Sequence, residues 1–382
     1  MSKESYIGGD YIETTGGNNL NYAKGSITNS SIVQVIQTGK EKGVTYNLNK
    51  VARRIEALAN EFSYIIVVGT QDHSSSTARN RLLQNVGEGS KLMFVHQALR
   101  RMRLNNGAIK FEFLLCKRGY SSSQRVAIKK SVENNYNGKY IEVSSAKQII
   151  NYINTCDKTN SSTTSKDRQR KKIQQLLFYS HGVVGEISLG LAPAGVDITE
   201  YSFEKEQAVK LNKDAFSFGA SIYLYSCRAG IGNKNVSKSI YINPKGSKTD
   251  PKSRYNLLSS ESIAQKISNS TKTTVYAFLR RTDYEETLFT RDELCFSDYM
   301  KIRKDNSQIR TRNYCNKYSY LLNKSVPLNG EDNKRWSIWS TTEANLEKID
   351  GAWFDPDGAR HNVKAAPTPA GVPATMMTFT PK

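Results

Sequence analysis

Five short apolar runs, each closed by a polar or turn-forming residue, constrain the fold of this chain more than any other feature. They are FSYIIVVG from Phe62, FEFLLC from Phe111, QQLLFYSHG from Gln174, SIYLYSC from Ser221 and TTVYAFLR from Thr273. Continuous apolar runs of this length are typical of parallel strands whose two faces are both buried. A further run, YIEVSS from Tyr140, predicts one more short strand.

Segments of helix length separate these runs. Apolar residues recur at helical spacing after Ser90, which is a candidate N-cap, and again after Ala146 and Glu261. Strands that alternate with helices predict an α/β domain with a mostly parallel sheet flanked by helices.

The two ends of the chain lack this alternation. Residues 1–45 are rich in Gly, Asn, Ser and Thr, which predicts an extended arm with one or two short strands. Residues 301–382 begin with a basic stretch and end in a Pro-rich tail that we expect to be extended. We therefore divide the chain into an N-terminal arm (1–45), an α/β domain (46–300) and a basic C-terminal extension (301–382).

The chain is strongly basic, with 55 Lys and Arg against 35 Asp and Glu and a formal net charge of +20. Such a surplus attracts nucleic acid, anionic lipid or acidic proteins. The basic residues gather at positions 100–103, at 166–172 and from 301 onward. No nucleic-acid reader motif or aromatic platform accompanies them, so we interpret them as a solvated surface and do not expect a nucleic-acid partner.

Cysteine and histidine usage argues against a metal site. The five cysteines include no CxxC spacing and the four histidines are scattered, so we expect neither zinc nor another cofactor. The first lysine is not followed by an apolar run, and no stretch reaches the roughly 18 apolar residues of a membrane span. These features predict a cytoplasmic protein that enters no membrane, has no signal peptide and keeps its thiols reduced.

Two of the apolar runs end in residues that can carry chemistry, Ser180-His181-Gly182 and Ser226-Cys227-Arg228. The carboxyl ends of neighbouring parallel strands meet at one edge of a sheet, where functional groups collect. Strands about 4.8 Å apart would bring the two side chains to within ~5–7 Å of each other. At that distance an imidazole can accept the proton of a thiol and activate it as a nucleophile.

Gly182 has no Cβ beside the histidine, so its backbone N–H could approach a substrate carbonyl. With the N–H of Cys227 it would form an oxyanion hole. Each residue also has an ordinary structural alternative, because a single Cys at a strand end is usually core and a single His is usually held by hydrogen bonds. The pair, with Gly182 directly after His181, favours a catalytic dyad.

At these motifs the sequence resembles the caspase-like cysteine peptidases of clan CD, in which His-Gly and small-residue–Cys motifs end adjacent strands. YSHGVVGEISLG is similar to the histidine strand and its short hairpin, and YLYSCRAG to the cysteine strand of CHAT-type proteases. The resemblance covers about residues 60 to 300. It implies a caspase-like protease domain with Cys227 as the nucleophile, His181 as the general acid and base, and Gly182 as the oxyanion donor.

The sequence departs from the family where substrate specificity is set. Caspases have Gln-Ala before the cysteine, where this chain has Tyr225 and Ser226, so specificity for aspartate is not supported. Branches that cleave after basic residues carry an acid at the position of Tyr225. Asp72 and Asp283 are alternative acids that could line a pocket for Lys or Arg, whereas the basic pair at 280–281 argues for the opposite charge. Ordinary solvated loop charges are the simpler interpretation of each.

The ends of the chain resemble those of effectors exported by type VI secretion systems of Bacteroidota. The matching segments are GGDYIETTGGNNLNYAKGSITNSS and FDPDGARHNVKAAPTPAGVP. This resemblance implies a toxin delivered into a rival cell without a signal peptide, with residues 1–45 as the delivery segment. An immunity protein or a component of the secretion apparatus would then be a partner.

The sequence therefore predicts a cysteine endopeptidase that cleaves protein substrates through a thioester intermediate. Two alternatives stay open. One is a catalytically latent caspase-like scaffold, which would have no need to keep both His181 and Cys227. The other is a basic nucleic-acid-binding protein, for which salt-dependent binding that survives loss of Cys227 is diagnostic.

Overall fold

The computed structural model describes fifteen stretches of the chain. They are residues 62–71, 90–105, 107–191, 199–234, 257–284, 287–288, 295–296, 299–300, 302–303, 316–328, 330–331, 333–334, 347–350, 352–369 and 372–382. The predicted N-terminal arm and Asp72 lie outside these residues, and so does most of the basic loop that follows Cys227.

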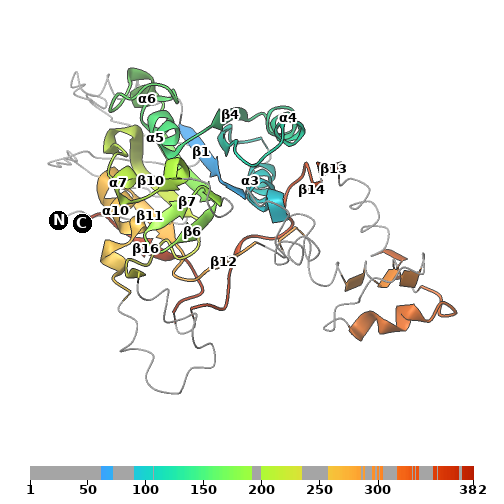
Figure 1. Ribbon diagram of the computed structural model, residues 1–382. Helices are drawn as coiled ribbons and strands as arrows, with labels where there is room; N and C mark the ends of the chain where they lie inside the picture. Colours follow the sequence, from blue (N-terminus) through green and yellow to red (C-terminus); the bar gives the residue numbers. More distant parts are fainter. Residues whose placement is uncertain are drawn as a thin grey trace, which may run out of the picture. The chain divides into compact units, whose positions relative to one another are not determined.

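A seven-stranded sheet in the order β16-β11-β10-β5-β1-β3-β4 forms the centre of the fold (Figure 1). Its strands are β1 (Ser63–Val68), β3 (Phe111–Cys116), β4 (Lys139–Val143), β5 (Ile173–Tyr179), β10 (Phe216–Leu224), β11 (Thr274–Ala277) and β16 (Met377–Phe379). All neighbouring pairs are parallel except β11 with β16, which is antiparallel. The predicted α/β architecture with a mostly parallel sheet is thereby confirmed.

Shorter elements complete the described fold. The small sheets are β6 (His181–Val183) with β7 (Glu186–Ser188) and β9 (Ser202–Phe203), β2 (Thr70–Gln71) with β8 (Gly190–Leu191), β12 (Thr282–Asp283) with β15 (Lys364–Ala365), and β13 (Glu347–Ile349) with β14 (Ala352–Phe354). The α-helices are α3 (Met93–Leu104), α4 (Ser122–Lys130), α5 (Ala146–Thr155), α6 (Lys166–Arg170), α7 (Lys205–Ala208) and α10 (Ile263–Thr271). Short 3₁₀ helices are η1 (Ser90–Leu92), η3 (Thr199–Tyr201), η4 (Lys213–Ala215), η5 (Ser259–Glu261) and η6 (Asn316–Leu322), and η2 (Ser131–Asn135) is a π-helix.

Both faces of the sheet are buried, as continuous apolar runs require. In β1, Ile65 and Val67 belong to the cluster that holds the buried residues of α5, α7 and α10. Ile66 and Val68 alternate with them and belong to the cluster of α3 and α4 on the opposite face. Alternate side chains of one strand point to opposite faces, so helices on both sides account for the absence of polar alternation in the sequence.

Serine caps fix the starts of four described helices. Ser121, Ser145, Ser165 and Ser262 each accept a hydrogen bond from the backbone N–H three residues later, at the starts of α4, α5, α6 and α10. The prediction that Ser90 caps a helix is wrong. The turn η1 begins at Ser90, and α3 follows at Met93 without a side-chain cap. A 3₁₀ turn of this kind closes a few backbone hydrogen bonds before the α-helix starts.

The order of the strands reverses between β1 and β5. The chain adds β3 and β4 on one side of β1 and then returns to place β5, β10 and β11 on the other side. In open α/β sheets, the crevice at the carboxyl ends of the strands flanking such a reversal is where ligands bind. β5 ends at Tyr179, two residues before His181.

The C-terminal residues, which we expected to form an extended arm, contribute strands to the α/β fold. β16 is the antiparallel edge strand beside β11, and β15 pairs with β12. The Asp355 N–H also donates to Nε2 of the buried His96 in α3, at 3.1 Å. The division at residue 300 stays a prediction, but the described C-terminal residues share hydrogen bonds with the domain before it.

A separate small cluster of buried residues includes Cys295, Phe296, Tyr299, Met300, Tyr318 and Leu321. Cys295 is disulfide-bonded, so the prediction that all the cysteines are reduced thiols is wrong for this residue. Cys116, Cys156 and Cys227 are free. None of the helices that the structure describes has the length and apolar character needed to cross a membrane.

Candidate active site

The register between β5 and β10 brings together the chain segments that carry His181 and Cys227. Leu224 is the partner of Phe178, and the Tyr225 N–H donates to the Phe178 carbonyl at 2.9 Å. The same offset of 46 residues joins Ser226 to Ser180, whose hydroxyl oxygens lie 2.9 Å apart and are fully buried. His181 and Cys227 are the next residues of the chain after this hydrogen-bonded pair.

Gly182 packs directly on the backbone of Cys227. A Cβ atom at position 182 would lie 2.5 Å from the Cys227 carbonyl oxygen and 2.9 Å from its backbone nitrogen. Contacts this short do not occur at real Cβ atoms, so only glycine fits here without a shift of one strand end. The two chain segments that carry the predicted dyad and oxyanion donor are thus in contact.

Aromatic side chains support the imidazole of His181, which is half-buried at the start of β6. The Phe94 ring from α3 contacts it edge-on, with 4.8 Å between ring centroids. Tyr284 contacts Phe94 in the same manner at 4.9 Å, and its hydroxyl donates to the Tyr225 carbonyl at 2.5 Å. Burial raises the pKa of Tyr284 far above its usual range, so it stays a neutral donor.

The half-buried sulfur of Cys227 contacts Thr282. The Thr282 N–H donates to Sγ at 3.2 Å, and the Thr282 hydroxyl lies 3.1 Å from the same sulfur. The sulfur also lies 3.8 Å from the Thr282 carbonyl oxygen, so three polar groups of Thr282 surround it. The resting thiol is therefore engaged on the side of the loop that follows β11.

Arg280, two residues before Thr282, joins this loop to the residue after Cys227 and to the C-terminal segment. The Arg228 N–H donates to the Arg280 carbonyl at 2.9 Å, which ties the residue after Cys227 to the loop. The Arg280 guanidinium donates to the Val372 carbonyl from Nε at 2.8 Å and from Nη2 at 2.5 Å. This guanidinium therefore holds the C-terminal segment and is committed to the fold.

Asp283 follows Thr282 in β12, opposite Lys364 of β15. Successive side chains of a strand point to opposite sides, so the Asp283 carboxylate lies on the side away from the Thr282 hydroxyl. Asp72, the other predicted acid, lies outside the described residues. Their role as substrate-binding acids stays a prediction.

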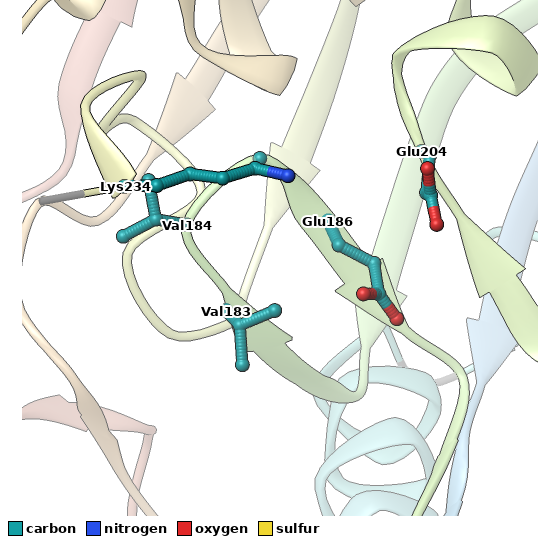
Figure 2. A pocket seen from close by; sticks show the side chains of 6 residues that line it. Val183, Val184, Glu186, Glu204 and Lys234 are labelled. Atoms are coloured by element: carbon teal, nitrogen blue, oxygen red, sulfur yellow. The ribbon is translucent and has the colours of Figure 1, made fainter. Parts of the chain in front are cut away.

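A pocket lies beside the hairpin that follows His181. It is lined by Val183, Val184, Gly185, Glu186, Glu204 and Lys234. Figure 2 shows Glu186 and Glu204 on one side of it and Lys234 on the other. The Ser202 hydroxyl donates to Oε1 of Glu186 at 2.8 Å. Among the described residues, no three His, Cys, Asp or Glu side chains gather in a way that would hold a metal ion.

Sequence reasoning missed several parts of this site. The serines at 180 and 226 had a signal, because each stands directly before a residue of the predicted dyad. Thr282 had no such signal, since it lies 55 positions after Cys227 in the chain. Phe94 lies in a segment that the sequence predicts to be helical, and nothing in the sequence marked it as part of the site. Comparison with models of known families, with characterised proteins and with solved structures finds no match to this chain.

Proposed function

We propose that this protein is a caspase-like cysteine endopeptidase in which Cys227 and His181 form the catalytic dyad. The observation that supports the proposal most is the contact of the two strand ends, with Gly182 on the backbone of Cys227. These ends lie at the carboxyl edge of a mostly parallel sheet, next to the reversal of strand order. The chain segments that carry a free cysteine, a histidine and a glycine end there, in the chain order that the family resemblance implies.

The proposed reaction is acyl transfer to the sulfur. His181 accepts the Cys227 proton, and the thiolate attacks the carbonyl carbon of the scissile peptide bond. The backbone N–H groups of Gly182 and Cys227 stabilise the negative oxygen of the tetrahedral intermediate. The imidazolium then gives its proton to the leaving amine, and a thioester remains. Water attacks the thioester carbonyl carbon and gives a proton to His181. The C–S bond then breaks, the carboxylic product leaves, and the proton returns from His181 to the Cys227 thiolate.

The substrate is proposed to be protein, with Asp72 and Asp283 as candidate acids for a basic side chain. The setting implied by the chain ends is a toxin of a type VI secretion system, with an immunity protein as partner. No metal or organic cofactor takes part in the proposed steps. These points rest on the resemblance in sequence, whereas the dyad rests also on the geometry of the strand ends.

A catalytically latent scaffold is the second candidate, and one observation favours it. The Cys227 sulfur makes its hydrogen bonds to Thr282 in this structure. Catalytic hydrogen bonds in free enzymes are often incomplete and tighten only when substrate binds. A reactivity measurement therefore separates the two candidates better than the resting geometry does.

The deciding experiment is alkylation of the folded protein by iodoacetamide at neutral pH, with mass mapping of each cysteine. We expect Cys227 to react faster than Cys156, whose thiol pKa is raised by burial. His181→Ala should lower the Cys227 rate by at least about tenfold, since the imidazole no longer takes the proton. The matched control is His361→Ala, at a half-buried histidine of the C-terminal segment. A Cys227 rate that His181→Ala leaves unchanged would sink the dyad and leave the scaffold.

A further inference from the structure

The loop that contacts the Cys227 sulfur is itself tied to the C-terminal segment. β12, which begins at Thr282, pairs antiparallel with β15, so that Thr282 lies opposite Ala365. The Arg281 N–H donates to the Thr368 carbonyl at 2.9 Å, and the Ala366 N–H donates to the Arg281 carbonyl at 2.8 Å. The edge of β12 next to the nucleophile is therefore occupied by the protein's own chain.

The described residues of this segment, 364–369 and Val372, are held on both sides. Beyond it, β16 pairs with the edge strand β11 of the main sheet. Before it, the Ala359 N–H donates to the His96 carbonyl of α3 at 2.8 Å. Between these two attachments, the Arg280 guanidinium donates two hydrogen bonds to the Val372 carbonyl. We call residues 364–369 together with Val372 the strap.

The strap fixes the position of the loop against the sulfur. Arg280, Arg281 and Thr282 each hydrogen-bond or pair with the strap, while Thr282 also meets Sγ. The loop cannot move away from Cys227 unless these contacts break. An extended peptide gains most of its main-chain hydrogen bonds from a free strand edge, and this edge beside the nucleophile is already paired.

We infer that the strap is a built-in inhibitory element that keeps the proposed peptidase latent until it is released from β12. The inference rests on the proposed function, because it concerns access to the same cysteine. Release frees the edge of β12 for an extended protein segment and lets the Thr282 loop leave the sulfur. The rest of the C-terminal residues, including β16, remain part of the sheet.

Two variants loosen the strap in different ways. Arg280→Ala removes both hydrogen bonds to Val372, and Ala366→Pro removes the N–H that donates to Arg281. Arg103→Ala is the matched control. Nη2 of Arg103 donates to the Ala359 carbonyl at 3.0 Å, so this variant also cuts a guanidinium bond to the C-terminal chain, but outside the strap. Far-ultraviolet circular dichroism and thermal unfolding establish that each variant is folded.

Two labelling rates of Cys227 are measured, one with a maleimide that carries a long polyethylene glycol chain and one with iodoacetamide. The readout is the first rate divided by the second. Iodoacetamide is small and reports on the reactivity of the sulfur. The large maleimide also requires that the strap and the Thr282 loop move away from the sulfur. We expect Arg280→Ala and Ala366→Pro to raise the ratio by about tenfold, the equivalent of one or two lost hydrogen bonds. Arg103→Ala should leave the ratio as it is in the unaltered protein.

An unchanged ratio in the folded strap variants overturns the inference, and so does an equal rise in Arg103→Ala. Arg280→Ala decides the question if Ala366→Pro does not fold. Failure of the proposed function has a different signature. The iodoacetamide rate alone would then be the same with and without His181, whatever the ratio of the two reagents does.

Discussion

Gly182 and Cys227 touch through their backbones, although 44 residues lie between them in the chain. Their contact follows from the parallel pairing of β5 with β10 and from the hydrogen-bonded pair Ser180–Ser226 just before it. The site is therefore assembled by backbone geometry, and the positions of its side chains depend on how closely these two strand ends approach. This dependence leads to the first prediction.

Gly182→Ala should disrupt the site without unfolding the protein. The added methyl group meets backbone atoms of Cys227, which cannot move independently of β10, so we expect a loss of about 1–3 kcal/mol in the free energy of unfolding. The His181-dependent labelling of Cys227 should fall to the rate seen in His181→Ala. Urea denaturation and iodoacetamide labelling measure the two effects. Gly330→Ala is the control, because a Cβ there meets nothing within 4 Å. Full labelling in Gly182→Ala would contradict the proposed contact.

Thr282→Val tests whether the Thr282 hydroxyl holds the resting thiol. Valine keeps the branched shape that suits β12 and removes the oxygen 3.1 Å from Sγ. We expect iodoacetamide to label Cys227 about threefold to tenfold faster, because one hydrogen bond worth about 1 kcal/mol no longer competes with His181. Slower labelling would mean that the hydroxyl supports the thiolate, which reverses the role of Thr282.

Glu112 of β3 should control stability at acidic pH. Its buried carboxylate accepts from the Ser63 and Tyr152 hydroxyls at 2.6 and 2.9 Å and lies 2.9 Å from Nζ of Lys171. Burial alone would raise the pKa of Glu112, but the charge of Arg168, the Ser63 hydroxyl and Lys171 outweigh it and lower the pKa below 4.5. A lowered folded pKa contributes stability that is fully present above pH 4.5 and is lost as the pH falls below it. Urea denaturation between pH 3 and 6 should show this loss, and Glu112→Gln should flatten it.

Arg168, the buried partner of Glu112, should contribute to the stability of the folded protein at neutral pH. Its side chain is fully buried, with Nη2 at 3.8 Å from Oε2 of Glu112. Arg168→Met should cost about 3–5 kcal/mol in unfolding free energy, since it leaves a buried carboxylate short of a partner. Arg170→Met, which breaks an exposed pair with Asp167, should cost no more than about 1 kcal/mol. Equal costs for the two variants would show that the buried pair is not special.

His96 should make the stability of the folded protein depend on pH in a second range, above that of Glu112. Burial, with a smaller effect of Arg360, lowers the pKa of His96 from 6.5 to about 3. The unfolded chain takes up a proton on this histidine below pH 6.5, whereas the folded protein does not, so stability falls as the pH drops from 6.5 toward 3. The slope approaches about 1.4 kcal/mol per pH unit. His96→Gln keeps an acceptor for the Asp355 N–H but does not titrate, so it should remove this slope between pH 6 and 5, as measured by urea denaturation. A slope that persists in the variant would place its origin elsewhere.

The sequence predicted the elements of the sheet well because their signals are local. The runs from Phe62, Phe111 and Thr273 begin within one residue of β1, β3 and β11. The run from Ser221 covers only the second half of β10, which begins at Phe216 before a break in its register with β5. Ser217 and Gly219 interrupt the apolar pattern between those positions and hid the start of the strand. Irregular pairing of this kind leaves no periodic pattern for a sequence to show.

The amino-acid sequence by itself determined the alternation of strands and helices, the burial of both sheet faces and the strand-end placement of His181 and Cys227. Each of these depends on the character of neighbouring residues, which the sequence displays directly. Only the tertiary structure decided that Thr282 lies on the Cys227 sulfur, that Phe94 supports the imidazole and that the strap pairs with β12. Such contacts join residues far apart in the chain, and packing and backbone hydrogen bonding select them among many partners of similar chemistry.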